Sequence, residues 1–259
     1  MKNVIISCLL VFALWCGWGS PAIASTQEEI DMSTQLWESS LHAINDVNCA
    51  SCHQDEETKE FVAQPKASCR SCHEAEVDTF MLGKHGIRLY EGESALNPTM
   101  ARLPMHAEAA NLQMGCATCH DTHSANTIPA AVDSCLTCHA DNHSLNYKNS
   151  RHAELFDADR NLPRPSANSV SCSTCHMARH ETTVGDRTTA WVNHNNTYNL
   201  LPRDRMVGEV CINCHGVEYS YNSIFDDELV EANFDAPPTL EMQTFDLMRA
   251  AEERRSNNN

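Results

Sequence analysis

Basic residues are scarce in this chain of 259 residues. Its 18 Lys and Arg face 35 Asp and Glu, which gives a formal net charge of −17 at pH 7. Such an acidic surface argues against binding to nucleic acid or to an anionic membrane, and it suits basic partners that are steered by electrostatic attraction. The alternative is a solvated surface whose charge only keeps the protein soluble.

Aromatic residues and strand patterns are sparse as well. Trp, Tyr and Phe make up 6% of the sequence, which is little material for an ordinary core in a chain of this length. No segment shows convincing alternation of apolar and polar residues, so no sheet is predicted. Helical spacing is present at 26–45 and at 239–255. In the second segment Thr239 is expected to cap a docking helix, and the tail from Asn257 is expected to fray.

No cysteine is left over beyond the N-terminal segment. Of the 14 cysteines, Cys8 and Cys16 lie in the apolar start, and the others form six Cys-x-x-Cys pairs, each followed directly by His. A disulfide framework would not give this uniform spacing, a zinc ribbon does not require the His, and a thioredoxin-like pair needs a βαβ setting. The six copies are Cys49–His53, Cys69–His73, Cys116–His120, Cys135–His139, Cys172–His176 and Cys211–His215.

Cys-x-x-Cys-His is the covalent attachment site of c-type haem, in which two thiols add to the porphyrin vinyl groups and the His ligates iron. The sequence therefore predicts six covalently bound c-type haems. Their porphyrins would supply the core that the side chains lack. The expected fold is mainly α with extensive irregular loops, wrapped around a chain of six haems. The predicted attachment residues are Cys49, Cys52, Cys69, Cys72, Cys116, Cys119, Cys135, Cys138, Cys172, Cys175, Cys211 and Cys214, with His53, His73, His120, His139, His176 and His215 as proximal iron ligands.

Eight histidines lie outside these motifs, and bis-His ligation of six irons needs six of them. The first four motifs form two similar units, in each of which a His precedes the first Cys and another follows the second motif. This repeat selects His42, His85, His106 and His152 as expected distal ligands. The position between the last two motifs selects His194 as a fifth. For the sixth, His123 is favoured, with His143 close behind and His180 last, while Met105 and Met114 are weaker alternatives. The expected distal ligands are His42, His85, His106, His123, His152 and His194, with His143 and His180 in reserve.

The N-terminus has the pattern of a secretory signal. Lys2 precedes an apolar stretch, and Ala22-Ile23-Ala24 offers a cleavage site. The expected organisation is a signal peptide at 1–24, a hexahaem domain at 25–235, and a C-terminal helix with a disordered tail at 236–259. Export predicts the periplasm of a Gram-negative cell, with outer-membrane association or an extracellular position as alternatives. No membrane span is expected after cleavage.

The doubled haem motifs, Ser150-Arg151-His152, and Cys211-Ile-Asn-Cys214-His215-Gly216 resemble the multihaem cytochrome c superfamily over roughly 42–220. This superfamily includes octahaem hydroxylamine oxidoreductases, pentahaem nitrite reductases and tetrahaem electron carriers of nitrifiers. The resemblance implies a mostly helical scaffold around stacked haems. Two departures lower the expectation of either enzymatic activity: no Cys-x-x-Cys-Lys motif is present, and only some forty residues follow the last motif.

These features favour an electron carrier between periplasmic or outer-membrane redox proteins that have basic or haem-exposing docking surfaces. An oligomer is compatible with the sequence, and no catalytic residue is assigned. The first alternative is an oxidoreductase of small nitrogen or sulfur compounds with one five-coordinate haem. Its proton donors would come from His143, His180, Tyr147 or Arg179. The second alternative is a protomer of a haem filament or larger redox complex, with a His donated between subunits.

Overall fold

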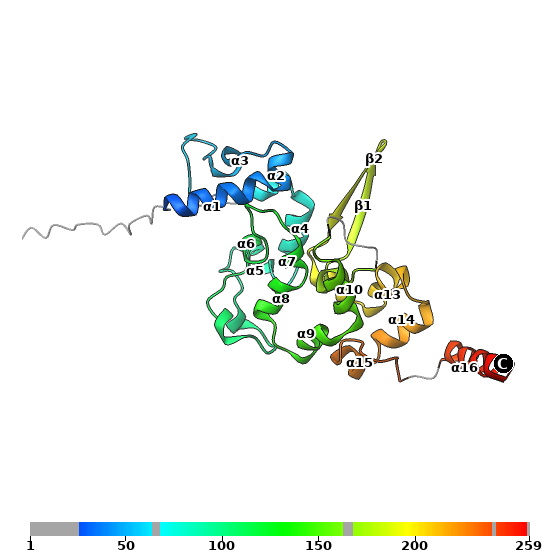
Figure 1. Cartoon of the computed structure of the whole chain (residues 1–259). Helices are drawn as coiled ribbons and strands as arrows, with labels where there is room; N and C mark the ends of the chain where they lie inside the picture. The colour runs from blue at the N-terminus through cyan, green and yellow to red at the C-terminus, as the bar shows by residue number, and fades with distance from the viewer. Residues whose placement is uncertain (1–25, 64–67, 163–167, 240–241, 258–259) are drawn as a thin grey trace, which may run out of the picture.

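The computed structural model describes residues 26–63, 68–162, 168–239 and 242–257, so the predicted signal peptide at 1–24 lies outside it. Within the described part, short helices joined by irregular segments form the body, and a β-hairpin rises from it (Figure 1). This mainly helical chain with long connections agrees with the expected fold class. No described helix is long and apolar enough to cross a bilayer.

The segment predicted as helical at 26–45 forms two helices. Thr26 caps the first through a reciprocal capping box with Glu29, in which each side chain bonds the backbone of the other. Ser40 then caps the second, because its hydroxyl accepts a hydrogen bond from the Ala43 amide. This part of the chain contains α1 (Gln27–Glu38), α2 (Leu41–Ile44) and α3 (Cys49–His53).

Most of the two repeat units lies in the middle of the chain. The apolar side chains of Val132, Tyr147, Ala153 and Phe156 form a small buried cluster there. The elements are η1 (Ser68–Ser71), α4 (Glu74–Leu82), α5 (Ile87–Tyr90), η2 (Pro98–Met100), η3 (Ala107–Ala109), α6 (Cys116–Cys119), α7 (Ile128–Ala131), α8 (Asp133–Cys138), α9 (Asn142–Asn146), η4 (Tyr147–Asn149), α10 (Arg151–Asp159) and α11 (Cys172–His176).

A β-hairpin of β1 (Arg179–Val184) and β2 (Arg187–Val192) corrects the expectation that no strand is present. Its residues are mostly exposed, so they carry no apolar–polar alternation. The overlooked signal is the two-residue turn Gly185-Asp186 between threonine-rich segments, where Gly185 adopts a φ of +61°. Antiparallel pairing sets His180 opposite Trp191.

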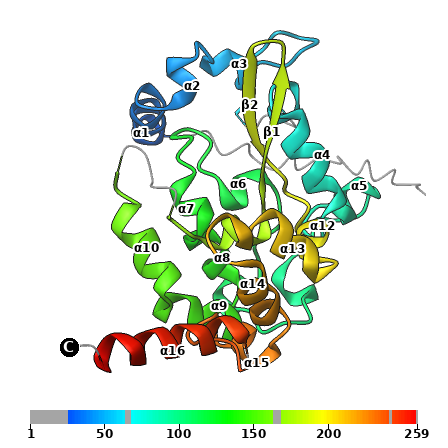
Figure 2. The same ribbon diagram turned by 90° about the vertical axis from the view of Figure 1, so that its right-hand side faces the viewer.

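The C-terminal part ends in a long helix that begins later than predicted. Thr239 does not cap it; the Thr239 amide and hydroxyl instead donate to Asp226 at 3.0 and 2.9 Å. The long helix reaches away from the body in Figure 1 and runs past α15 in Figure 2. The elements are α12 (Asn196–Leu200), α13 (Arg203–Glu209), η5 (Cys211–Asn213), α14 (Val217–Ile224), α15 (Asp227–Glu231) and α16 (Gln243–Asn257).

Side chains alone provide a thin core. A second buried cluster joins Met206 and Val207 to Ile224, and many large apolar residues remain exposed, among them Phe61 at 73% and Ile44 at 72%. This exposure leaves apolar side chains without cover from the rest of the chain. It agrees with a chain that packs around large apolar groups.

Candidate haem-binding sites

The six attachment motifs, numbered here as sites 1 to 6 in chain order, fold as short helical turns. In a helical turn the first Cys, the second Cys three positions later and the His four positions later share one face. The backbone bond of the turn is present at His120, whose amide donates to the Cys116 carbonyl at 3.0 Å, and at His215, whose amide donates to the Cys211 carbonyl at 2.9 Å. None of these twelve cysteines is joined to another by a disulfide in the described part of the chain.

Polar caps begin several of these turns. The Asn48 side chain accepts from the Ser51 amide at 3.2 Å at site 1, and the Ser171 hydroxyl accepts from the Thr174 amide at 3.2 Å at site 5. Such caps stabilise turns that are too short to form on their own. Each turn therefore presents its thiols and imidazole together.

Each motif histidine lies opposite one histidine from outside the motifs. The ring centroids of the six pairs are separated by 6.0–6.3 Å. The pairs are His53–His123 at site 1, His73–His42 at site 2, His120–His194 at site 3, His139–His85 at site 4, His176–His143 at site 5 and His215–His152 at site 6.

This separation fits two imidazoles on opposite sides of one metal ion. Two metal–nitrogen bonds of about 2 Å, with the distance from each nitrogen to its ring centre, span roughly 6 Å. In the described residues, no three His, Cys, Asp or Glu side chains gather as they would around a bare metal ion. Two protein ligands per site suit an iron whose other ligands come from a porphyrin.

Hydrogen bonds at the second ring nitrogen orient several of these imidazoles. The Nδ1 atoms of His53, His194 and His143 lie 2.9, 2.9 and 2.5 Å from the carbonyl oxygens of Val62, Val192 and Val230. A carbonyl only accepts, so each Nδ1 carries the proton and the lone pair of Nε2 is left for a metal. Sites 1, 3 and 5 each have such a histidine.

Burial favours the neutral imidazoles that metal ligation requires. It lowers the pKa of His85 to about 4, with a further contribution from the nearby His139. Burial likewise lowers the pKa of His176 to about 4, with His143 adding to the effect. Both histidines are therefore uncharged at neutral pH.

The expected distal ligand His106 and the reserve candidate His143 lie in different surroundings. His106 belongs to none of the six pairs among the described residues, whereas His143 faces His176. The His106 amide donates to the Cys138 carbonyl at 2.9 Å, and Met105 pairs with His139, so this segment lies along motif 4 itself. His143 follows His139 by four residues on α9 and faces the site of the next motif.

The remaining expected distal histidines all lie in pairs. His194 faces His120, far back in the sequence, because its loop is held against α4. The Thr79 hydroxyl accepts from the His194 amide at 3.0 Å. A side chain at Gly83 would come within 2.9 Å of the His194 carbonyl, so glycine allows this close approach. The pairing of each distal His to one motif could not be read from the sequence, because it depends on such long-range contacts.

The six sites adjoin one another in a continuous order. The Cys69 thiol of site 2 lies close enough to the Cys116 thiol of site 3 for each to shift the pKa of the other, and the same holds for Cys135 of site 4 and Cys172 of site 5. Burial raises the pKa of Cys119 to about 11, with Cys135 of site 4 contributing.

Contacts between neighbouring sites also place sites 6 and 1, at the two ends of the set. Cys175 of site 5 and Cys211 of site 6 both pack against the buried cluster of Met206, Val207 and Ile224, so sites 5 and 6 are neighbours. At the other end, His123 faces His53 and lies three residues after His120, which joins site 1 to site 3. Sites 1 and 2 therefore both adjoin site 3, and sites 4, 5 and 6 follow.

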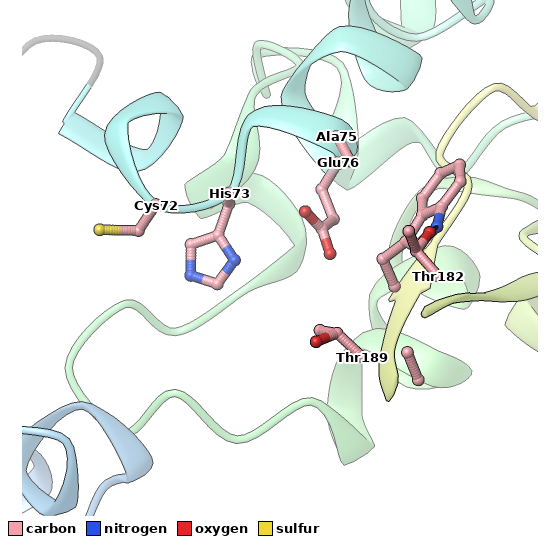
Figure 3. Close-up of a pocket in the computed structure, with 8 residues that line it drawn as sticks. Cys72, His73, Ala75, Glu76, Thr182 and Thr189 are labelled. Carbon is pink, nitrogen blue, oxygen red and sulfur yellow. Dashed lines mark hydrogen bonds between the residues drawn. The ribbon is translucent and has the colours of Figure 1, made fainter. Parts of the chain in front are cut away.

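A pocket of about 540 Å³ adjoins site 2 between the start of α4 and the hairpin (Figure 3). Cys72, His73 and Glu76 line one side, and Thr182, Thr189 and Trp191 line the other. Its volume lies within the range of cofactor sites. The reserve candidate His180 stacks on Trp191 across the hairpin, with 5.0 Å between the ring centroids. It belongs to none of the six His–His pairs of the described residues.

Comparison with known proteins gives one partial match. Residues 68–133 match the family model described as "Cytochrome c554 and c-prime". No curated protein and no solved structure matches the chain. The match supports, at a coarse level, a multihaem cytochrome c with covalently bound c-type haem and an electron-transfer role.

Proposed function

We propose that this chain is an exported hexahaem c-type cytochrome that transfers electrons between redox partner proteins. The observation that carries the proposal is the set of six His–His pairs, each joining one motif histidine to one outside the motifs at 6.0–6.3 Å. Haem iron supplies one-electron chemistry, and the protein contributes attachment, axial ligands and the surroundings that set the potential.

In this proposal the paired histidines are the axial ligands of the same iron. The motif cysteines of each site attach its haem. The distal ligands are His123, His42, His194, His85, His143 and His152 for sites 1 to 6.

Complete ligation supports a carrier over an enzyme. Catalysis at haem needs an open iron position, and each of the six sites has a second imidazole at ligating distance. All six pairs also form within one chain, so no histidine from another subunit is needed, as the filament alternative would have it. The succession of neighbouring sites, with sites 1 and 2 beside site 3 and sites 4, 5 and 6 after it, supports passage of electrons from one site to the next.

The net charge of −17 supports basic partner surfaces. Electron-transfer complexes are typically small and transient, and long-range attraction raises their rate of encounter. The periplasm is the proposed location, because covalent haem attachment accords with the predicted signal peptide.

Intact-protein mass spectrometry of the exported protein tests the haem count. We expect a mass increase of six haems over the processed chain. The matched variant Cys211→Ser with Cys214→Ser should carry five, because only site 6 loses its thiols. A wild-type mass with fewer than six haems, or an unchanged count in the variant, would contradict the proposal.

A further inference from the structure

Asp141 lies beside one proximal histidine as a charged partner. Its Oδ2 is 3.6 Å from Nδ1 of His139, the motif histidine of site 4. The Asp141 side chain is only 17% exposed, so water screens its charge weakly. Within the described part of the chain, this is the one close approach of a carboxylate to a histidine nitrogen.

Ser144 fixes the carboxylate in this position. The Ser144 hydroxyl donates to Oδ2 of Asp141 at 2.8 Å, and the Ser144 amide donates to Oδ1 at 3.1 Å. Asp141 is thereby the N-cap of α9. Its orientation toward His139 is built into the start of the helix.

The contact differs in kind from those at the other sites. His53, His194 and His143 direct Nδ1 at neutral backbone carbonyls. A carboxylate is ionised at neutral pH. At 3.6 Å, which is beyond hydrogen-bond distance, Asp141 acts on the His139 imidazole through its charge and makes it a stronger electron donor. A nearby negative charge also stabilises the more positive oxidation state of that metal.

Asp141 also affects the neighbouring site. It caps the helix that carries His143, which faces His176 of site 5. One carboxylate therefore lies between sites 4 and 5.

We propose that Asp141 is a positioning residue that lowers the reduction potentials of the haems at sites 4 and 5, with the larger effect at site 4. This rests on the proposed function. Ferric iron carries one more positive charge than ferrous iron, so the carboxylate favours the oxidised state at both sites. The middle of the molecule then holds electrons less readily than it would without Asp141.

The substitution Asp141→Asn separates charge from structure. Asn has nearly the same shape and is an equally good N-cap, so α9 should remain folded. The matched control is Asp226→Asn, which removes the same charge at the N-cap of the adjacent α15. The Asp226 carboxylate accepts from Leu229 and Thr239, with no iron-ligand histidine among the partners described for it.

Spectroelectrochemical titration of both variants and of wild type, followed by optical and EPR spectra, tests the proposal. We expect Asp141→Asn to raise the equilibrium constant for reduction of one haem about tenfold, which is about 59 mV for one electron. A second component should shift upward by less. The EPR spectrum of one low-spin species should change as its proximal imidazole becomes a weaker donor, and Asp226→Asn should leave all components in place.

Failure of the Asp141 proposal can be distinguished from failure of the proposed function. If Asp141→Asn retains six low-spin haems and every potential of wild type, the role of Asp141 is overturned and the proposed function is untouched. An equal shift in Asp226→Asn would also overturn it, because the effect would then be one of net charge. A wild-type protein with fewer than six haems by mass would overturn the proposed function and the Asp141 proposal together.

Discussion

At the scale of single residues, the contacts of a histidine decide its role. Eight histidines outside the motifs have the same chemistry in the sequence, but six of them face a motif histidine, and His180 stacks on Trp191. Histidine ligates metal through one nitrogen, and the partner of the other nitrogen fixes the tautomer. The carbonyl of Val230 does this for His143.

The reserve candidate His143 and the expected distal ligand His106 give a direct test at this scale. In His143→Ala the haem at site 5 loses its second imidazole, so we expect one ferric iron to become high-spin and to bind added imidazole. His106→Ala is the control and should leave six low-spin irons. EPR of the oxidised variants reads the spin states. A high-spin signal in His106→Ala but not in His143→Ala would reverse the assignment.

The sequence predicted the motif residues directly, because covalent attachment requires a fixed local spacing. It was less able to choose between His106 and His143, since the repeat argument assumes that equivalent positions have equivalent roles. The structure shows instead that the His106 segment runs along motif 4, where its amide bonds the Cys138 carbonyl. Only the path of the chain distinguishes the two.

At the scale of elements, two positions of the sequence repeat serve different purposes. Gly83 and Ser150 each precede a distal histidine by two residues. Gly83 leaves room for the loop that carries His194. Ser150 caps α10 by accepting from the Ala153 amide at 3.2 Å, and its hydroxyl donates to the Tyr147 carbonyl at 2.7 Å. The sequence shows a small residue at both positions but not the contact that each one makes.

Loss of the α10 cap should weaken site 6, whose distal histidine is His152. Ser150 is 1% exposed, so Ser150→Ala leaves the Ala153 amide without its acceptor away from water, while the Tyr147 carbonyl keeps the hydrogen bond from the amide of residue 150. We expect the free energy of unfolding to fall by about 1 kcal/mol. Denaturant titration of the haem-loaded protein, followed by far-UV circular dichroism, measures it.

The control for this prediction is Ser256→Ala on the exposed face of α16, where the effect should stay within about 0.5 kcal/mol. Equal stability of Ser150→Ala and wild type would show that the α10 cap contributes nothing. A loss at Ser256 as large as that at Ser150 would show that the effect is not specific to the buried cap.

At the scale of the whole molecule, the thin side-chain core and the paired histidines have one explanation. The two buried clusters are small, while large apolar residues such as Phe61 and Ile44 stay exposed on the chain alone. Six porphyrins would cover such surface and fill the space between paired imidazoles. The scarcity of aromatics and the short helices predicted this dependence on cofactor, but the β-hairpin beside site 2 was missed because its strands are polar on both faces.

Low-temperature EPR with near-infrared magnetic circular dichroism of the oxidised protein, with and without nitrite, hydroxylamine or cyanide, tests the central claim most directly. If each of the six His–His pairs ligates one iron, all six irons will be low-spin with two histidine ligands, and none will respond to the added ligands. A high-spin iron that binds any of them would contradict this account, because one of the six pairs would then not ligate its iron and the molecule would contain a candidate active site.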